Sequence, residues 1–276
     1  MNMNECPNCH FHNQPGAKFC VKCGTKLTGN SSNVHNESKK KQQPRSPQSD
    51  ATNGLNNVFT YFVASVKHPV KYEAPGEKYL GYISLGVFTV LTWLVSFVLA
   101  MRINGGLANE SIPYSVLHKM NGVFNTSLMG LGLIIALLGL LSWILGYVGI
   151  HFVMNNAMSL SEYTNEYGRF LNIGIILLLV GIIFAAVMPA GILMLIGLYL
   201  VSLAITISGW ALTYEVLVSK DFGSIDRFYV LLVITVVVAI VAVVCVSLLW
   251  GSLSSQLSNL GQELIGRFMG SLNQDY

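Results

Sequence analysis

The sequence predicts an all-α membrane protein, a five-helix transmembrane bundle with a small metal-binding segment at its amino terminus. Of the 276 residues, 53% are hydrophobic and only 11% are charged, whereas about 25% of the residues in soluble domains are charged. The mean hydropathy is +0.55, and the apolar residues gather in five runs of about 20 residues, the length that crosses a bilayer. Four of the five cysteines lie within the first 23 residues. A purely soluble chain and a largely disordered one are excluded.

Five continuous apolar runs define the expected membrane spans. They cover Leu80 to Met101, Ser127 to about Met154, Leu171 to Met188, Ala190 to Thr213 and Phe228 to Trp250. The third and fourth come from one stretch without charged residues, between Arg169 and Glu215, which is too long for a single crossing. Because the apolar residues are continuous rather than alternating, the spans are predicted to be helices and not strands of a barrel.

Amphipathic segments are expected on both sides of the spans. Apolar residues recur at steps of three and four from Leu55 to Val66, and Pro69 ends this pattern, which predicts a short helix along the membrane surface. After the last span, leucines recur at helical spacing from Leu253 to Leu272, which predicts a second amphipathic helix at the outer interface. The membrane domain therefore covers residues 55–276. Residues 27–54, rich in Asn, Ser, Gln and Lys, form a flexible linker before it.

The distribution of Lys and Arg predicts the orientation of the chain, because the cytoplasmic flanks of membrane spans carry an excess of these residues. With the amino terminus inside, the inner flanks hold six of them and the outer flanks hold three. The inner residues are Lys67, Lys71, Lys78, Arg169, Lys220 and Arg227, and the outer residues are Arg102, Lys119 and Arg267. No signal peptide precedes the first span. We expect a multi-pass protein of the cell membrane with its amino terminus in the cytoplasm and its carboxyl terminus outside.

The amino-terminal cysteines form two CxxC pairs separated by ten residues. They are Cys6, Cys9, Cys20 and Cys23. Each pair can present two thiolates from one tight turn, and four thiolates make the closed tetrahedral site that zinc favours. A segment this short buries little core, so we expect the metal to supply its folding free energy. Two redox pairs or disulfides are the alternative. His10 and His12 are competing ligands, although four thiolates already fill a zinc site.

Two resemblances follow from these motifs. CPNC and KFCVKCG resemble the amino-terminal zinc ribbon of many bacterial membrane and regulatory proteins, over residues 1–26, which implies a structural zinc and no activity. His10 stands where that pattern usually has Gly. The spans, with VKHPVKY before the first and EYGRFLNIG leading into the third, resemble bacterial Yip-like membrane proteins over residues 58–250, without the Pro that this family often has at the third span. This second resemblance implies a non-catalytic helical protein of membrane organisation.

Glycines recur at heptad spacing within two of the spans. They are Gly132, Gly139 and Gly146 in the second span and Gly174 and Gly181 in the third. Such stripes let helix backbones approach closely where lipid gives no hydrophobic incentive to associate. We expect packing within the bundle, and a homo-oligomer seam is the alternative. Gly139 in particular is expected to lie where two backbones are close.

Other polar residues offer no catalytic arrangement. No Asp, Glu, Lys or Arg lies in the middle of a span, where such a residue would mark function. Glu162 and Glu166 could hold a metal, but Ser159 and Glu162 have capping-box spacing, which favours a solvated helix start. His151 is expected at the interface and Cys245 as an apolar filler. We therefore predict that the chain is not an enzyme.

The sequence leaves three functional hypotheses. The leading one is an organising or regulatory membrane protein that contacts a protein partner through its zinc ribbon. Nucleic acid is disfavoured as the partner because residues 1–26 carry few basic side chains and no interleaved aromatic platforms. The second is a transporter or channel for a neutral or lipid-like substrate, which would need a hydrated cavity with Asn172, Thr206 and Ser208 as candidate lining residues. The third is a regulator that senses zinc or envelope state.

Overall fold

The structure is a computed structural model in which two compact units are described separately, Met1–Asp50 and Ala51–Tyr276. The described residues are 4–6, 8, 11–13, 17, 19–23, 25, 47–70, 78–107, 114–188, 191–219 and 225–272. Most of the expected linker, residues 27–46, lies outside them. Residues 47–54, which the sequence also assigned to the linker, are helical.

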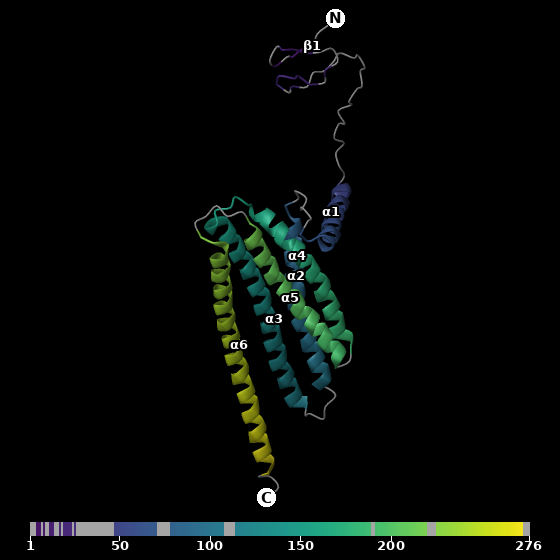
Figure 1. Cartoon of the computed structure of the whole chain (residues 1–276). Helices are drawn as coiled ribbons and strands as arrows, with labels where there is room; N and C mark the ends of the chain where they lie inside the picture. Colours follow the sequence, from purple (N-terminus) through teal and green to yellow (C-terminus); the bar gives the residue numbers. More distant parts are fainter. Residues whose placement is uncertain are drawn as a thin grey trace. The chain divides into compact units, whose positions relative to one another are not determined.

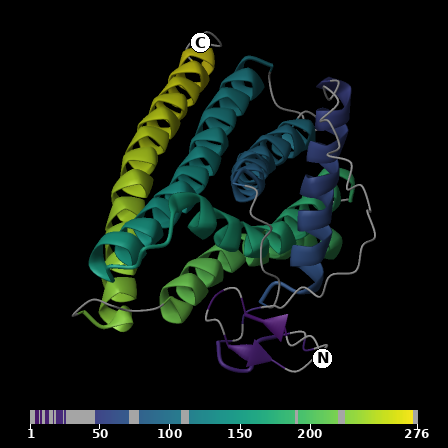
Figure 2. The ribbon, with the colours of Figure 1, turned by 90° about the horizontal axis from the view of Figure 1, so that it is seen from above.

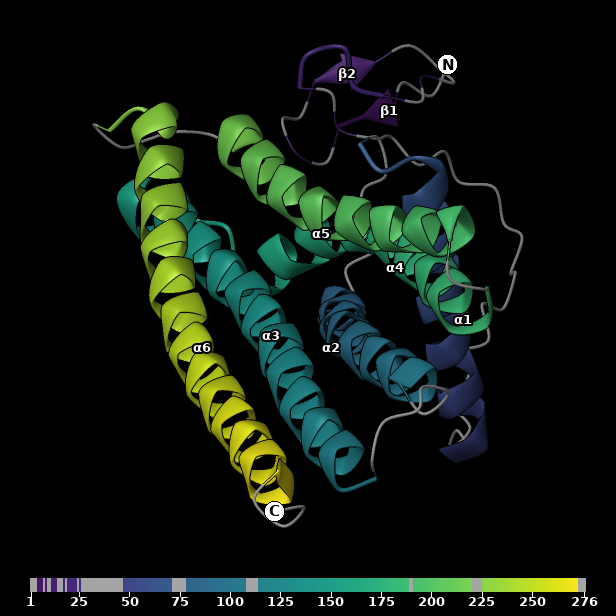
Figure 3. The same ribbon diagram turned by 90° about the horizontal axis from the view of Figure 1, so that it is seen from below.

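The amino-terminal unit contains a two-stranded antiparallel sheet, β1 (Asn4–Glu5) and β2 (His12–Asn13). Glu5 lies opposite His12 in the register, and the strands are drawn as short arrows in Figure 3. A tight turn follows, in which the Cys6 amide donates to the Phe11 carbonyl at 3.0 Å. A second turn of the same kind joins the Cys20 amide to the Thr25 carbonyl at 2.8 Å. Each CxxC motif therefore begins at a hydrogen-bonded turn.

Every regular element in the described part of the second unit is a helix (Figure 1). They are α1 (Pro47–Lys67), α2 (Leu80–Leu107), α3 (Tyr114–Val148) with its π-helical continuation η1 (Gly149–Val153), α4 (Leu160–Val187), α5 (Ile192–Val218) and α6 (Arg227–Leu272). Five of these helices are long and apolar enough to cross a membrane. The predicted fold class is confirmed, and so is the division of the stretch after Arg169 into two helices, α4 and α5.

Helix α4 lies at the centre of the packing. It contacts α2 on one side and α5 on the other, while α3 packs against α2 and α6. Seen from above and from below, α6 stands at one edge of the bundle beside α3 (Figures 2 and 3). The apolar face of α4, with Leu171, Ile175 and Leu178, forms the middle of the core. The bundle is thus layered around α4 rather than arranged evenly around a central axis.

Glycines lie at the closest contacts between helices. One of the glycines predicted to do so, Gly139, does not. A Cβ on Gly81 of α2 would overlap the Thr164 carbonyl of α4, and a Cβ on Gly181 of α4 would lie 2.8 Å from the Gly197 carbonyl of α5. Gly132, Gly146 and Gly174 of the predicted stripes also meet neighbouring side chains closely. Gly139 has nothing within 4 Å. The expectation for Gly139 is wrong, because this residue faces a cavity rather than another backbone.

Helix α1 packs against α4 through polar groups, which the apolar pattern did not indicate. Tyr61 and Ser65 are buried, whereas Leu55 and Phe59 of the predicted apolar face are 70% and 69% exposed. The Tyr61 hydroxyl donates to the Asn165 carbonyl at 2.6 Å, and the Asn172 amide donates to the Ser65 hydroxyl at 2.7 Å. These two contacts attach α1 to α4, and the expected position on the membrane surface stays a prediction.

The predicted second amphipathic helix is not a separate element. Helix α6 is continuous for 46 residues, and at 1.5 Å per residue it is about 70 Å long, more than the roughly 40–45 Å of a bilayer with its headgroups. Helix α3 begins at Tyr114 rather than Ser127. The two extended ends are joined by an ion pair between Lys119 and Glu263. If α6 crosses a bilayer, part of this helix must therefore lie outside it.

The α2–α4 contact predicts the effect of a single methyl group. Gly81→Ala places a Cβ against the Thr164 carbonyl, so we expect a loss of unfolding free energy of about 1–3 kcal/mol, the usual range for overpacking. Gly86→Ala is the matched control, because Gly86 lies in the same helix with nothing within 4 Å of its Cβ position. Thermal unfolding in mild detergent measures both. Equal midpoints for the two variants would contradict the contact.

Candidate metal centre and buried ion-pair network

Three of the four predicted thiol ligands meet in the amino-terminal unit. The sulfur atoms of Cys6, Cys20 and Cys23 all lie within 4.8 Å of one another, and those of Cys6 and Cys23 are 3.5 Å apart. None of these three described cysteines forms a disulfide. The fourth predicted ligand, Cys9, lies outside the described residues, and so does His10. His12 is part of β2 and is exposed, and it is not a member of the cluster.

Asn13 connects the two cysteine turns, and the sequence analysis missed it. Its side chain is buried; the amide nitrogen donates to the Phe11 carbonyl at 2.9 Å, and the amide oxygen accepts from the Val21 amide at 3.0 Å. One side chain thus bridges the turn after Cys6 and the turn after Cys20. The sequence contains one signal for this role, the polar residue Asn13 near the end of the first turn. Its partner in the second turn, the Val21 amide, follows only from the fold.

The surroundings of Cys20 favour its anionic form. Enclosure by the chain acts to raise the pKa of this thiol, but hydrogen bonds from the Cys23 and Lys22 amides and from Asn13 outweigh that effect, so the pKa is lowered from its ordinary value. Thiolate is the form of cysteine that binds metals. The converging soft sulfur donors suit a metal such as zinc.

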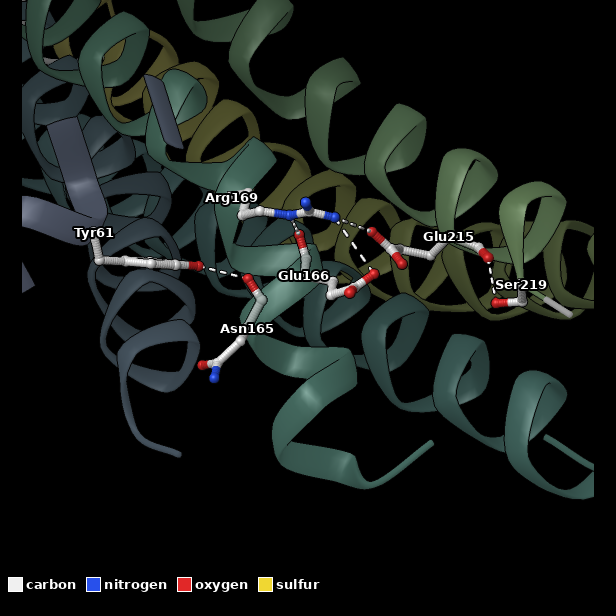
Figure 4. A network of polar contacts seen from close by, with 6 residues as sticks. All are labelled: Tyr61, Asn165, Glu166, Arg169, Glu215 and Ser219. Carbon is white, nitrogen blue, oxygen red and sulfur yellow. Dashed lines mark hydrogen bonds and ion pairs between the residues drawn. The ribbon is translucent and has the colours of Figure 1, made fainter. Parts of the chain in front are cut away.

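A second polar cluster lies at one end of the helical unit (Figure 4). Arg169 of α4 and Glu215 of α5 are 5% and 2% exposed, and their closest charged atoms are 3.8 Å apart. Arg169 also pairs with the half-buried Glu166 at 3.4 Å and donates through Nε to the Glu166 carbonyl at 3.2 Å. The Ser219 hydroxyl donates to the Glu215 carbonyl at 2.6 Å.

The burial of this ion pair was not predicted, although the sequence contains a signal for it. Arg169 was treated only as a positive flank of the third span. Arg169 and Glu215 are opposite charges at the two ends of one charge-free stretch, and an antiparallel helical hairpin brings the ends of such a stretch together. Charges taken out of water require a partner, and these two residues face each other as an ion pair at 3.8 Å.

Asn165 links three helices next to this pair. Its side-chain oxygen accepts from the Gly81 amide at 2.7 Å, at the start of α2, while its carbonyl accepts from Tyr61 of α1. The first amides of a helix have no partner within the helix, so Asn165 satisfies a group that would otherwise be buried and unpaired. The network is therefore connected to the assembly of α1, α2 and α4.

The remaining predicted residues do not form a second site. Ser159 and Glu162 make the predicted capping box at the start of α4, and Glu166 turns to Arg169 instead of toward Glu162. His151 stacks on Tyr147 with ring centroids 5.2 Å apart, and Cys245 is half-buried on α6. The structure does not bring the three candidate channel residues together. Asn172 is buried against Ser65, Thr206 is exposed, and Ser208 lines a cavity.

Comparison with known proteins gives two family matches. The model of the family described as Domain of unknown function (DUF6574) matches residues 48–259, and the model of the zinc-ribbon domain matches residues 6–27. No curated protein and no solved structure matches the chain. The zinc-ribbon resemblance is confirmed, whereas the comparisons give no support for the Yip-like resemblance.

The buried pair predicts a large asymmetry between single and double variants. Arg169→Met leaves the Glu215 carboxylate buried without its cation, which typically costs about 3–5 kcal/mol, whereas replacing both members of a buried pair is often close to neutral. We therefore expect Arg169→Met to lower the unfolding free energy strongly and Arg169→Met with Glu215→Leu to recover most of it, measured by unfolding in detergent.

Lys119→Met is the control for this experiment. It breaks the ion pair with Glu263. The side chains of Lys119 and Glu263 are 48% and 36% exposed, and exposed pairs contribute only about 0–1 kcal/mol. If Arg169→Met costs no more than Lys119→Met, the α4–α5 pair does not hold a buried charge in place.

Proposed function

We infer that this chain, which belongs to the DUF6574 family, is a multi-pass membrane protein whose zinc ribbon binds a protein partner in the cytoplasm. The role is organising or regulatory rather than enzymatic. The observation that carries this proposal is the exposure of large apolar side chains on the ribbon. Phe11, Phe19 and Val21 are 40%, 57% and 81% exposed, and a partner that covered them would remove this apolar surface from water, which is favourable.

The ribbon holds the backbones of two of these residues, Phe11 and Val21, on adjacent turns. Asn13 joins the Phe11 carbonyl to the Val21 amide, so the two residues lie on neighbouring turns. The Lys22 ammonium lies 5.8 Å from the centre of the Phe11 ring, a cation–π distance. Aromatic residues are enriched at protein interfaces. A metal that ties the two turns together would preorganise this surface, which lowers the entropic cost of binding.

The proposed orientation rests on the distribution of charge along the helices. Five membrane-capable helices place the two termini on opposite sides of a bilayer if all of them cross. The six-to-three excess of Lys and Arg puts the amino terminus in the cytoplasm of a cell membrane. The carboxyl-terminal end of α6, with the part of α3 that it contacts, then extends on the outer side.

We expect one zinc ion per chain, held by Cys6, Cys9, Cys20 and Cys23. Cys20→Ser removes one thiolate from the predicted set, so zinc affinity should fall at least tenfold, because even residues around a metal site change affinity about 10–100-fold. Metal analysis of the reduced full-length protein after a challenge with a weak chelator measures this. Cys245→Ser, outside the ribbon, should retain zinc like the parent. Unchanged retention in Cys20→Ser would refute the ligand assignment.

The interaction role is tested by affinity purification of the full chain from mild detergent. We expect specific partners to be lost when residues 1–26 are deleted and also in Val21→Asp, which changes the exposed surface without removing a thiol. Metal analysis of Val21→Asp shows whether the ribbon still binds zinc. Leu55→Asp is the matched control, because Leu55 is similarly exposed and lies on α1.

Two results would count against the proposal. The first is an identical set of partners in the parent, the deletion and Val21→Asp. This result would mean that the ribbon does not bind the partners. The second concerns orientation and is measured with epitopes at the two termini of the same protein. The epitope after Tyr276 should be reached on intact cells, and the one before Met1 only after permeabilisation. Labelling of both termini under the same condition would exclude an odd number of crossings.

A further inference from the structure

A cavity opens between four of the membrane-capable helices. Its volume is about 300 Å³, and its walls come from α2, α3, α4 and α5. Leu85, Phe88 and Leu171 form its buried inner wall. Gly209 of α5 lies on its exposed side. The cavity therefore runs from the surface of the bundle between α3 and α5 into the core around α4.

Two glycines keep this space open. Gly139 of α3 and Gly209 of α5 both line the cavity, and a Cβ at either position would meet nothing within 4 Å. Protein interiors rarely leave voids larger than a water molecule, because atoms that line an empty space lose their packing contacts. Any larger side chain at these two positions would fill part of the space. This arrangement explains why Gly139 departs from the close contacts of the other stripe glycines.

The cavity lies within the apolar part of the helices. Tyr167 is seven residues after the start of α4, and Gly139 is nine residues before the end of α3, so at 1.5 Å per residue the space is roughly 10–14 Å from those helix ends. In a bilayer, the medium around apolar helix segments consists of lipid chains.

The walls offer a ligand no hydroxyl proton. Thr89, Thr92, Ser142 and Ser208 each donate to a carbonyl of their own helix at 2.7–2.8 Å. The Tyr167 hydroxyl donates to the Ser208 carbonyl at 3.1 Å. No Asp, Glu, Lys, Arg or His is among the residues that line the cavity in the described part of the chain. A head group that accepts hydrogen bonds, such as a phosphate, would lose those from water and find no hydroxyl proton in exchange, which is unfavourable.

We propose that this cavity binds one hydrocarbon chain of a membrane lipid. Its volume is at the lower end of ligand pockets, its walls are apolar or already hydrogen-bonded, and its open side lies between α3 and α5. The lipid chain enters between Gly139 and Gly209 and packs on Phe88 and Leu171, while the head group stays outside. The site is independent of the zinc ribbon and of the interaction role proposed for it.

The experiment uses the full chain in phosphatidylcholine vesicles that contain a phosphatidylcholine with a diazirine on one acyl chain. After illumination, mass spectrometry compares labelling at Ile135 and Ile205, which line the cavity, with labelling at Val243 on the exposed side of α6. Bound lipid should label the two cavity residues at least fivefold more than Val243. In Gly139→Leu and in Gly209→Leu, cavity labelling should fall to the level of Val243.

Gly86→Leu is the matched control. Gly86 is also a helical glycine with nothing within 4 Å, but it does not line the cavity, so its substitution should leave the labelling ratio unchanged. Cavity labelling no greater than that of Val243, or an equal fall in Gly86→Leu, overturns the proposal. Thermal unfolding in detergent is measured in parallel. Because leucine enters open space, Gly139→Leu and Gly209→Leu should unfold at a temperature no lower than the parent does. If neither variant folds, the space is not open, and the proposal is also overturned.

Discussion

The membrane unit depends on one constraint, the need to satisfy the polar groups of α4 away from water. Arg169 is the only cation among the buried charged side chains of the described residues, and it meets Glu215 on α5 and Glu166 on its own helix. A buried pair adds little net stability compared with apolar residues, but it penalises every arrangement that separates the partners. The pair therefore favours those arrangements of α4 and α5 that keep Arg169 beside Glu215.

The same constraint governs how α1 and α2 join the bundle. Asn165 accepts one hydrogen bond from the beginning of α2 and another from α1, and Asn172 donates to Ser65 of α1. These contacts require the backbones of α2 and α4 to meet, and Gly81 together with Gly168 allows the required approach. Small residues and polar groups thus act at the same crossing, because lipid offers apolar surfaces no comparable reason to associate.

The two units are stabilised by different kinds of interaction. In the amino-terminal unit, converging thiols and the Asn13 side chain connect two turns that bury almost no apolar core. In the helical unit, buried polar pairs and close helix contacts hold five long apolar helices together. The exposed Phe11, Phe19 and Val21 belong to the first of these two units.

The sequence by itself determined those features that depend on local chemistry along the chain. The lengths of the apolar runs predict the five helices, the spacing of the cysteines predicts the thiol cluster, and Ser159 with Glu162 predicts the start of α4. Only the tertiary structure decided which face of each helix meets a neighbour. It placed Gly139 on a cavity, turned Tyr61 rather than Leu55 into the bundle, and buried Arg169 against Glu215. The physical reason is that helical periodicity defines faces but not the rotation and register of one helix against another, which are selected by the joint packing and hydrogen bonding of residues far apart in the chain.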